Sequence, residues 1–155
     1  MEKVVRKLQM GRMTLLLMTI LTGIYFVLLL FGIQMDSPYS AFLPQFLAVI
    51  AHAMMVEFGF SVSVLFVVLL GIALIAIYAL AWVKTKTSAK WFMIAFILFF
   101  VDTLFLIYWY QNILTQLPVL LTIAIHFIIL YYLYTSYQTF AKNPAAPDWS
   151  KGKYK

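Results

Sequence analysis

Four stretches of this chain reach the length of about 20 residues that an apolar helix needs to cross the ~30 Å hydrocarbon core of a bilayer. They cover residues 13–33, 60–83, 91–111 and 117–140, and Asp102 is the one residue in them that is charged at neutral pH. Because lipid offers no partners for backbone N–H and C=O groups, such segments cross as helices, which satisfy those groups internally. The pattern predicts an all-α fold: an integral membrane four-helix bundle, with 13–140 as a single four-span membrane domain.

The composition excludes several classes of protein. Hydrophobic residues make up 65% of the 155 residues and charged residues only 10%, whereas a water-soluble domain has about 25% charged residues. The chain has no cysteine, which excludes disulfide bonds and thiolate chemistry. The formal charge of +6 comes from short segments that flank the spans. We therefore expect membrane lipid as a partner and no nucleic acid.

The basic residues predict the orientation. All 11 lysines and arginines fall on a single side if the chain crosses the membrane four times. Since basic residues are retained on the cytoplasmic side, the basic N-terminal segment 1–12 and the polar tail 141–155 are both predicted to be cytoplasmic. The chain is therefore expected to be a multi-pass protein of the plasma membrane.

A fifth apolar segment, residues 41–56, is shorter than a membrane span. Pro44 stands near its start, where a helix tolerates proline because the N–H there has no partner to lose. If this segment crossed the membrane, Lys84 and Lys86 would lie outside, against the positive-inside rule. We expect one short helix on the outer side, either interfacial or re-entrant.

Two ionisable residues, Asp102 and His126, lie within the third and fourth spans. A carboxylate in a span costs about 2.5–3.5 kcal/mol on insertion scales and therefore needs a partner. Both residues are 12 positions from Leu114 in the outer turn, which puts them at about the same depth. One interpretation is a buried proton or cation relay, and the other is an interhelical hydrogen bond that fixes packing. No metal site is expected, because two ligands are too few and no zinc-binding spacing occurs.

His52 and Glu57 lie on or just after the predicted outer helix. Their spacing of five residues places them on different faces of a helix. They are expected to form a polar edge at the interface. The alternative is the entrance to an outer cavity with Asp102 and His126 at its floor.

Small residues recur at helical intervals in the first two spans, where they allow helices to approach closely. These predicted helix-packing residues are Thr19, Thr22, Gly23, Gly71, Ala73, Ala76 and Ala79.

Three short motifs resemble those of a family of small bacterial four-span integral membrane proteins without an assigned activity. They are Phe42-Leu43-Pro44, Val101-Asp102-Thr103-Leu104, and His126 followed by Leu130-Tyr131-Tyr132-Leu133. The resemblance implies a bacterial plasma membrane. It also implies that the aspartate and the histidine belong to a shared site, and it brings no substrate or cofactor.

The sequence contains no nucleophile elbow, P-loop, Rossmann glycine pattern or zincin motif. We therefore favour a non-enzymatic accessory or scaffold subunit, or a small homo-oligomer, which acts through helix packing with a protein partner or a second copy. One alternative is a small carrier or channel with Asp102 and His126 as its relay. Another is a lipid-modifying enzyme with an outer-side cavity. No cofactor is expected.

Overall fold

The structure, a computed structural model, describes residues 2–33 and 38–143. These residues form five α-helices and one short 3₁₀ helix, with no strand among them. The elements are α1 (Glu2–Leu30), α2 (Phe42–Phe58), α3 (Val62–Lys84), α4 (Lys90–Trp109), η1 (Gln111–Ile113) and α5 (Leu117–Lys142). Helices α1, α3, α4 and α5 are long and apolar enough to cross a membrane, which confirms the predicted all-α membrane bundle.

The helices differ from the predicted segments mainly at their ends. Helix α1 begins at Glu2, so the predicted basic segment 1–12 continues into the first span as one helix of 29 residues. No proline interrupts it, and lysine, arginine, leucine and methionine all favour the helical state. Helices α2 and α5 end at Phe58 and Lys142, slightly later than predicted. Residues 144–155 of the predicted tail lie outside the described residues.

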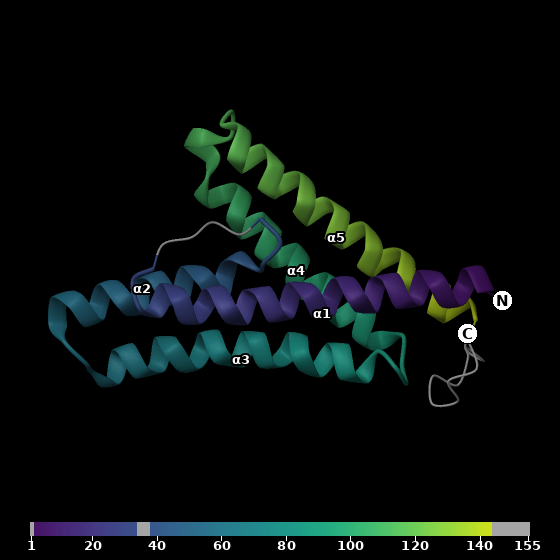
Figure 1. Cartoon of the computed structure of the whole chain (residues 1–155), viewed down its shortest axis with the longest axis horizontal. Helices are drawn as coiled ribbons and strands as arrows, with labels where there is room; N and C mark the ends of the chain where they lie inside the picture. Colours follow the sequence, from purple (N-terminus) through teal and green to yellow (C-terminus); the bar gives the residue numbers. More distant parts are fainter. Residues whose placement is uncertain (1, 34–37, 144–155) are drawn as a thin grey trace.

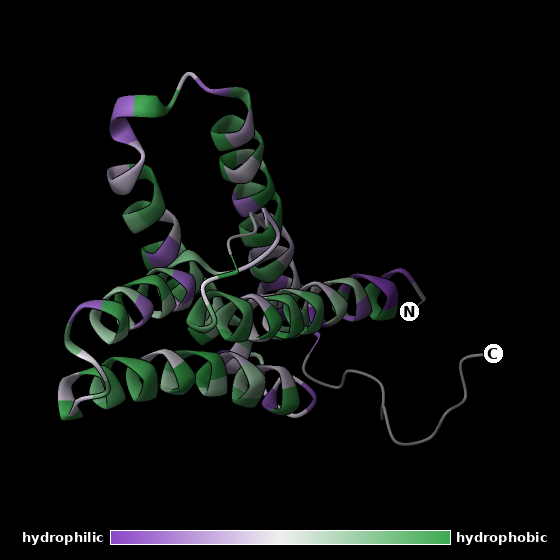
Figure 2. Ribbon diagram, turned by 60° about the vertical axis from the view of Figure 1, so that its left-hand side comes forward, coloured by the Kyte–Doolittle hydropathy of each residue, from purple (hydrophilic) through white to green (hydrophobic). Residues whose placement is uncertain are grey.

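Helix α1 is the central element of the bundle. Helices α1, α2 and α3 run alongside one another, and the hairpin of α4 and α5 crosses this group at an angle (Figure 1). The hairpin contacts α1 mainly through α5 and diverges from α1 toward its own turn (Figures 1 and 2). Green, apolar ribbon dominates all four long helices, and the purple, polar segments concentrate near their ends (Figure 2).

The described lysines and arginines gather at one end of the bundle, which we call the basic end. The start of α1, the connection between α3 and α4, and the end of α5 meet there (Figure 1). Arg12 donates a hydrogen bond from Nε to Thr85 Oγ1 over 3.3 Å, and the Ser136 hydroxyl donates to the Lys7 carbonyl over 3.1 Å. The end that carries the other connections is called the opposite end.

Helix α2 starts inside the bundle. The N–H of Ala41, its N-cap residue, donates to Thr22 Oγ1 over 2.9 Å. Thr22 precedes the end of α1 at Leu30 by about 12 Å, at 1.5 Å per residue. From this depth α2 runs back to the opposite end, where Gly59 follows its last residue and α3 begins. The segment therefore starts within the bundle and returns to the end at which α1 finishes.

The main core lies where α1 meets the hairpin of α4 and α5, with contributions from α3. Its largest fully buried apolar side chains are Leu8, Leu15, Met18, Tyr78, Phe92, Phe99, Ile129 and Leu133. At the basic end, α1 and α5 approach so closely that a Cβ atom on Gly11 would lie 2.0 Å from Ser136 Oγ. This contact fixes the crossing of α1 and α5.

The predicted helix-packing residues occupy different environments. Thr19 and Thr22 are buried, and a Cβ atom on Gly71 would lie 2.3 Å from the ring of Phe26. A Cβ atom on Gly23 would meet nothing within 4 Å. Ala79 is half-buried, whereas Ala73 and Ala76 are exposed on α3. The small size of Gly71 thus allows α3 to pack closely on α1. The exposed Ala73 and Ala76 have no such role within the chain.

Candidate functional site

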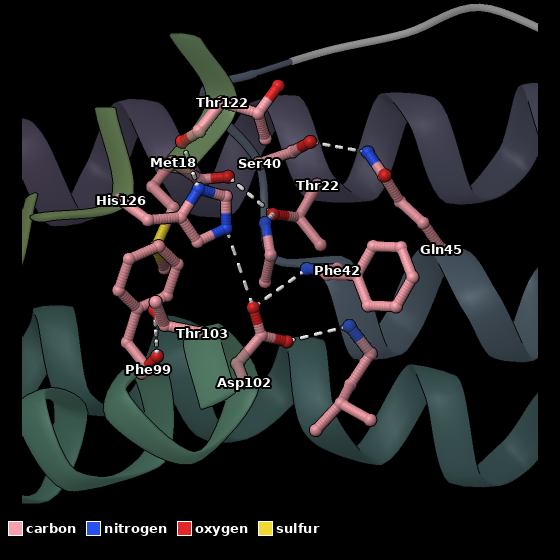
Figure 3. A network of polar contacts seen from close by, with 12 residues as sticks. Met18, Thr22, Ser40, Phe42, Gln45, Phe99, Asp102, Thr103, Thr122 and His126 are labelled. Carbon is pink, nitrogen blue, oxygen red and sulfur yellow. Dashed lines mark hydrogen bonds and ion pairs between the residues drawn. The ribbon is translucent and has the colours of Figure 1, made fainter. Parts of the chain in front are cut away.

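Asp102 lies on α4 directly below the N-terminus of α2 (Figure 3). Its carboxylate accepts hydrogen bonds from two backbone N–H groups, that of Phe42 to Oδ2 over 2.8 Å and that of Leu43 to Oδ1 over 2.6 Å. The side chain is 1% exposed. A residue from a different helix, 59 to 60 positions away in the chain, therefore performs the N-capping that a local Ser, Thr, Asp or Asn usually performs.

The first turn of α2 has every backbone N–H accounted for. A helix leaves its first four N–H groups without intrahelical partners. Here the N–H of Ala41 donates to Thr22 Oγ1, and those of Phe42 and Leu43 donate to Asp102. The fourth position is Pro44, which has no N–H to satisfy. The sequence around Pro44 thus suits a helix that begins away from water.

This capping explains how the bundle accommodates a buried carboxylate. Hydrogen bonds to an ionised acceptor are roughly twice as strong as neutral ones. The N-terminus of a helix also carries a partial positive charge, which favours an anion by about 0.3–2 kcal/mol. Both effects act on Asp102, so the backbone of α2, and not a basic side chain, is its main stabilising partner.

His126, on α5, lies on the other side of the same carboxylate. Its Nδ1 atom is 2.9 Å from the Thr122 carbonyl oxygen, and its ring stacks on Phe99 with 4.8 Å between centroids. Its Nε2 atom is 3.7 Å from Asp102 Oδ2 and has no hydrogen-bond partner among the described residues. The structure therefore brings together the two residues that were expected to lie at the same depth, at a distance longer than a hydrogen bond.

The hydrogen bonds of His126 imply its proton arrangement. Since Nδ1 faces a carbonyl oxygen, which only accepts, we infer that Nδ1 carries a hydrogen. In a neutral imidazole, Nε2 would then direct a lone pair toward the carboxylate of Asp102. One further proton, on either His126 or Asp102, replaces this repulsion with attraction.

A pocket of about 250 Å³ leads to this pair from the opposite end. It lies between the start of α2, the end of α4 and the first half of α5, with the η1 turn at its rim. Its polar lining residues are Ser40, Gln45, Tyr110, Gln116, Thr122 and His126. His126 lies about 12 Å along α5 from Pro118 at the rim. The imidazole, itself 0% exposed, therefore lies at the inner end of a pocket with mixed polar and apolar lining.

The bundle is closed on the other side of the pair. Between it and the basic end lie Met18, Phe99, Ile129 and Leu133, each 0% exposed. Tyr78 from α3 packs edge-on against Phe99, with 6.5 Å between ring centroids. These buried side chains separate the pair from the basic end.

His52 and Glu57 lie apart from this site. The His52 ring packs against Gly32 after the end of α1, with Nδ1 3.1 Å from the Leu30 carbonyl oxygen. Glu57 is exposed near the end of α2. Neither residue lines the pocket that ends at His126. This pocket is therefore lined by other residues than the two that the sequence offered for a cavity entrance.

Several residues of the site carry no signal in the sequence that would identify them. Thr22 was expected only to pack, yet its hydroxyl accepts from Ala41 N–H while donating to the Met18 carbonyl over 2.7 Å. Gln45 donates a hydrogen bond to Ser40 beside the pocket. Threonines, serines and glutamines of this kind occur throughout membrane helices. The sequence indicates only where α2 starts, because Ser40 precedes its first turn and Pro44 lies within that turn.

Replacing Thr22 with valine is expected to destabilise the fold by about 1–3 kcal/mol, because the buried N–H of Ala41 would lose its acceptor. The matched control is Thr19→Val. Its hydroxyl donates only to the Leu15 carbonyl of the same helix, so we expect a cost of at most about 0.6 kcal/mol. Reversible unfolding with SDS in mixed micelles measures both variants. Equal destabilisation by the two variants would show that the hydrogen bond from Ala41 to Thr22 does not contribute more to stability than an ordinary bond within a helix.

The described residues contain no group of three or more His, Cys, Asp or Glu side chains that could hold a metal ion. Comparisons with protein-family models, with curated proteins and with solved structures found no match to this chain.

Proposed function

We propose that this chain is a non-enzymatic, multi-pass protein of the bacterial plasma membrane that senses protons or a small polar ligand from the outer side and responds by changing how firmly α2 is held. Both termini then lie in the cytoplasm, since basic segments stay on that side. One observation carries the proposal: the carboxylate of Asp102 caps α2 and also faces His126 at the floor of the pocket.

The proton shared by the pair links the pocket to α2. With that proton on His126, Asp102 is a carboxylate and binds the N–H groups of Phe42 and Leu43 strongly. With the proton on Asp102, the same bonds are neutral and roughly half as strong. A ligand in the pocket that reaches Nε2 of His126, which is buried in this structure, would favour the second arrangement. A local change of charge of this kind can shift a structural element between two arrangements. In this proposal that element is α2.

Few other charges act on the pair. Among the described residues that line the pocket there is no lysine, arginine, aspartate or glutamate. The titratable neighbours are Tyr110 at the pocket and Tyr78 on α3, behind Phe99. Helices α1 and α2 contribute the Thr22 hydroxyl and backbone N–H groups. The pair is therefore expected to dominate any pH response in this part of the molecule.

The output of such a sensor requires a partner within the membrane, either another protein or a second copy of this chain. Helix α3 packs on α2 and exposes Ala73 and Ala76 one turn apart. Small residues on an exposed helix face allow a second helix to approach closely. Native mass spectrometry of a gentle detergent extract tests this part of the proposal. A lone monomer in repeated preparations would contradict it.

The pH response is testable because the chain has only two histidines. In a His52→Gln background with ¹⁵N-labelled histidine, His126 gives the only imidazole signals. We expect these signals to titrate reversibly in nanodiscs, and the backbone amide signals of Phe42 and Leu43 to shift with the same midpoint. A titration of His126 that leaves both amides unchanged would contradict the coupling.

His126→Gln is expected to leave the fold intact and to remove the pH-dependent shift at Phe42 and Leu43. The reason is that Asp102 retains both N–H bonds to α2, while its proton-sharing partner is gone. Thermal unfolding and the amide titration are measured on the same sample. If this variant fails to fold, or if the shift persists, the pair has a structural role only.

A carrier is the second candidate, favoured by the start of α2 at mid-bundle. Transporters often place the ends of discontinuous helices at a binding site near the membrane midplane. The two functions differ in proteoliposomes that contain a pH-sensitive dye. A carrier moves protons or cations down their gradient, whereas a sensor leaves the gradient unchanged.

A further inference from the structure

A second cavity, of about 350 Å³, lies at the basic end between the first turns of α1 and the last turns of α5. The start of α1 and the end of α5 lie side by side there (Figure 1). The lining residues are Lys3, Val4, Lys7, Thr135, Gln138, Thr139, Lys142 and Asn143. Three of the eight are lysines, and none is acidic. We call this cavity the lysine cleft.

The lysine cleft is built by the packing of α1 on α5. Lys3 and Lys7 are four residues apart on α1 and so share one face of that helix. The Ser136 hydroxyl donates to the Lys7 carbonyl over 3.1 Å, and the contact at Gly11 holds the same two helices together one turn further on. These contacts hold against each other the two helices that carry the three lysines, whose side chains are exposed.

The lining favours an anion with several acceptor oxygens. Three ammonium groups supply positive charge, and the side-chain amide of Gln138 makes no hydrogen bond to the described residues and is free to donate. The acidic side chains that the structure describes, Asp102 and Glu57, are not among the lining residues. Lysine is a common phosphate binder and acts as a point charge with three donors. The cleft also lies beside the ends of α1 and α5, two of the four helices that are long and apolar enough to cross a membrane, and the ends of such helices are expected near the lipid headgroups.

We propose that the lysine cleft binds a phosphate group, and that an anionic phospholipid headgroup supplies it. This site is independent of the pocket at His126, which lies toward the opposite end of α5. General attraction to an anionic membrane depends on how many lysines lie near the surface. Binding at a specific site depends instead on the lysines that line the cleft. The experiment therefore compares these lysines with an equal number of lysines elsewhere.

The experiment compares two triple variants of the full chain in nanodiscs of phosphatidylcholine that contain a minor fraction of phosphatidylglycerol. One carries Lys3→Gln, Lys7→Gln and Lys142→Gln, which neutralise the lysine cleft. The matched control carries Lys84→Gln, Lys86→Gln and Lys90→Gln, at the same end of the bundle but outside the cleft. Native mass spectrometry counts the phosphatidylglycerol molecules that each variant retains.

We expect the cleft variant to lose at least tenfold in retained phosphatidylglycerol, and the control to stay within about twofold of the original chain. A third variant, Thr139→Leu, adds bulk to the cleft without changing its charge and is expected to lose the lipid as well. Equal losses in both triple variants, or no loss in either, would overturn the proposal.

A second arm uses inorganic phosphate and the protein in a non-ionic detergent. If phosphate binds there in a manner that requires the three cleft lysines, while phosphatidylglycerol shows no preference over phosphatidylcholine in nanodiscs, the source is free phosphate and the lipid assignment is wrong. Thermal unfolding of each variant identifies any loss that comes from misfolding. Such a variant is replaced by the single change Lys142→Gln, for which we expect at least a threefold loss.

Discussion

Replacing Asp102 with alanine is expected to lower the free energy of unfolding by about 2–6 kcal/mol, since one buried and one partly buried N–H group would lose their acceptor at about 1–3 kcal/mol each. These are the groups of Phe42 and Leu43 at the start of α2. Water cannot replace the carboxylate easily, because the side chain is 1% exposed. We expect α2 to detach from α4 before the rest of the bundle unfolds.

Reversible unfolding with SDS in mixed micelles measures the size of this effect, and amide hydrogen exchange at residues 41–45 locates it. Thr103→Ala is the matched control. Thr103 is the neighbouring residue, also 1% exposed, and its hydroxyl donates only to the Phe99 carbonyl of its own helix. Asp102→Asn is expected to fall between the two, because an amide oxygen can accept one N–H while the NH₂ group repels the other. A cost at Asp102 no larger than that at Thr103 would refute the capping role.

Replacing Gly11 with alanine is expected to cost about 2–4 kcal/mol, the sum of an overpacked contact at about 1–3 kcal/mol and a weakened interhelical hydrogen bond at ~0.6 kcal/mol or more. The added Cβ atom would lie 2.0 Å from Ser136 Oγ and 3.2 Å from the Tyr132 carbonyl oxygen. The second of these atoms belongs to the backbone, so α1 and α5 must move apart.

Two further variants separate this contact from the intrinsic preference of glycine. Gly23→Ala, on the same helix, meets nothing within 4 Å and is expected to be neutral or to stabilise by about 0.5–1 kcal/mol. Ser136→Gly removes both side-chain atoms near Gly11 and is expected to restore part of the stability in the double variant. A coupling energy near zero between the two positions would show that the close contact does not limit stability.

The element types and their order follow from the sequence, because each depends on a local property. Hydrocarbon length predicted the four long helices, and the basic residues at alternate ends predicted that 41–56 does not cross. Pro44 correctly indicated the start of a helix, since its missing N–H suits that position. Equal spacing from the turn predicted the same depth for Asp102 and His126, and it did not predict whether their faces meet.

The partners of these residues depend on contacts between distant segments, and here the sequence was least informative. It paired Asp102 with His126, whereas the closest contacts of the carboxylate are backbone N–H groups of α2. Backbone groups exist at every position, so no residue type marks the ones that a buried carboxylate will bind. For the same reason, the sequence does not show that the Thr22 hydroxyl accepts a hydrogen bond from the N–H of Ala41. His52 was expected at a polar edge, with a cavity entrance as the alternative. The structure packs its ring against Gly32, because the rotation of α2 about its own axis is set by packing on α1 and α3.

The sequence by itself determined that the chain places four helices in a membrane with its basic residues at one end, because the transfer of each segment into lipid depends only on that segment's own composition. The tertiary structure alone decided that α2 enters the bundle, that Asp102 caps it, and that three lysines converge in one cleft. These features require particular faces of separate helices to meet. Helix faces meet according to shape and close packing, for which periodicity and hydropathy are too coarse a description.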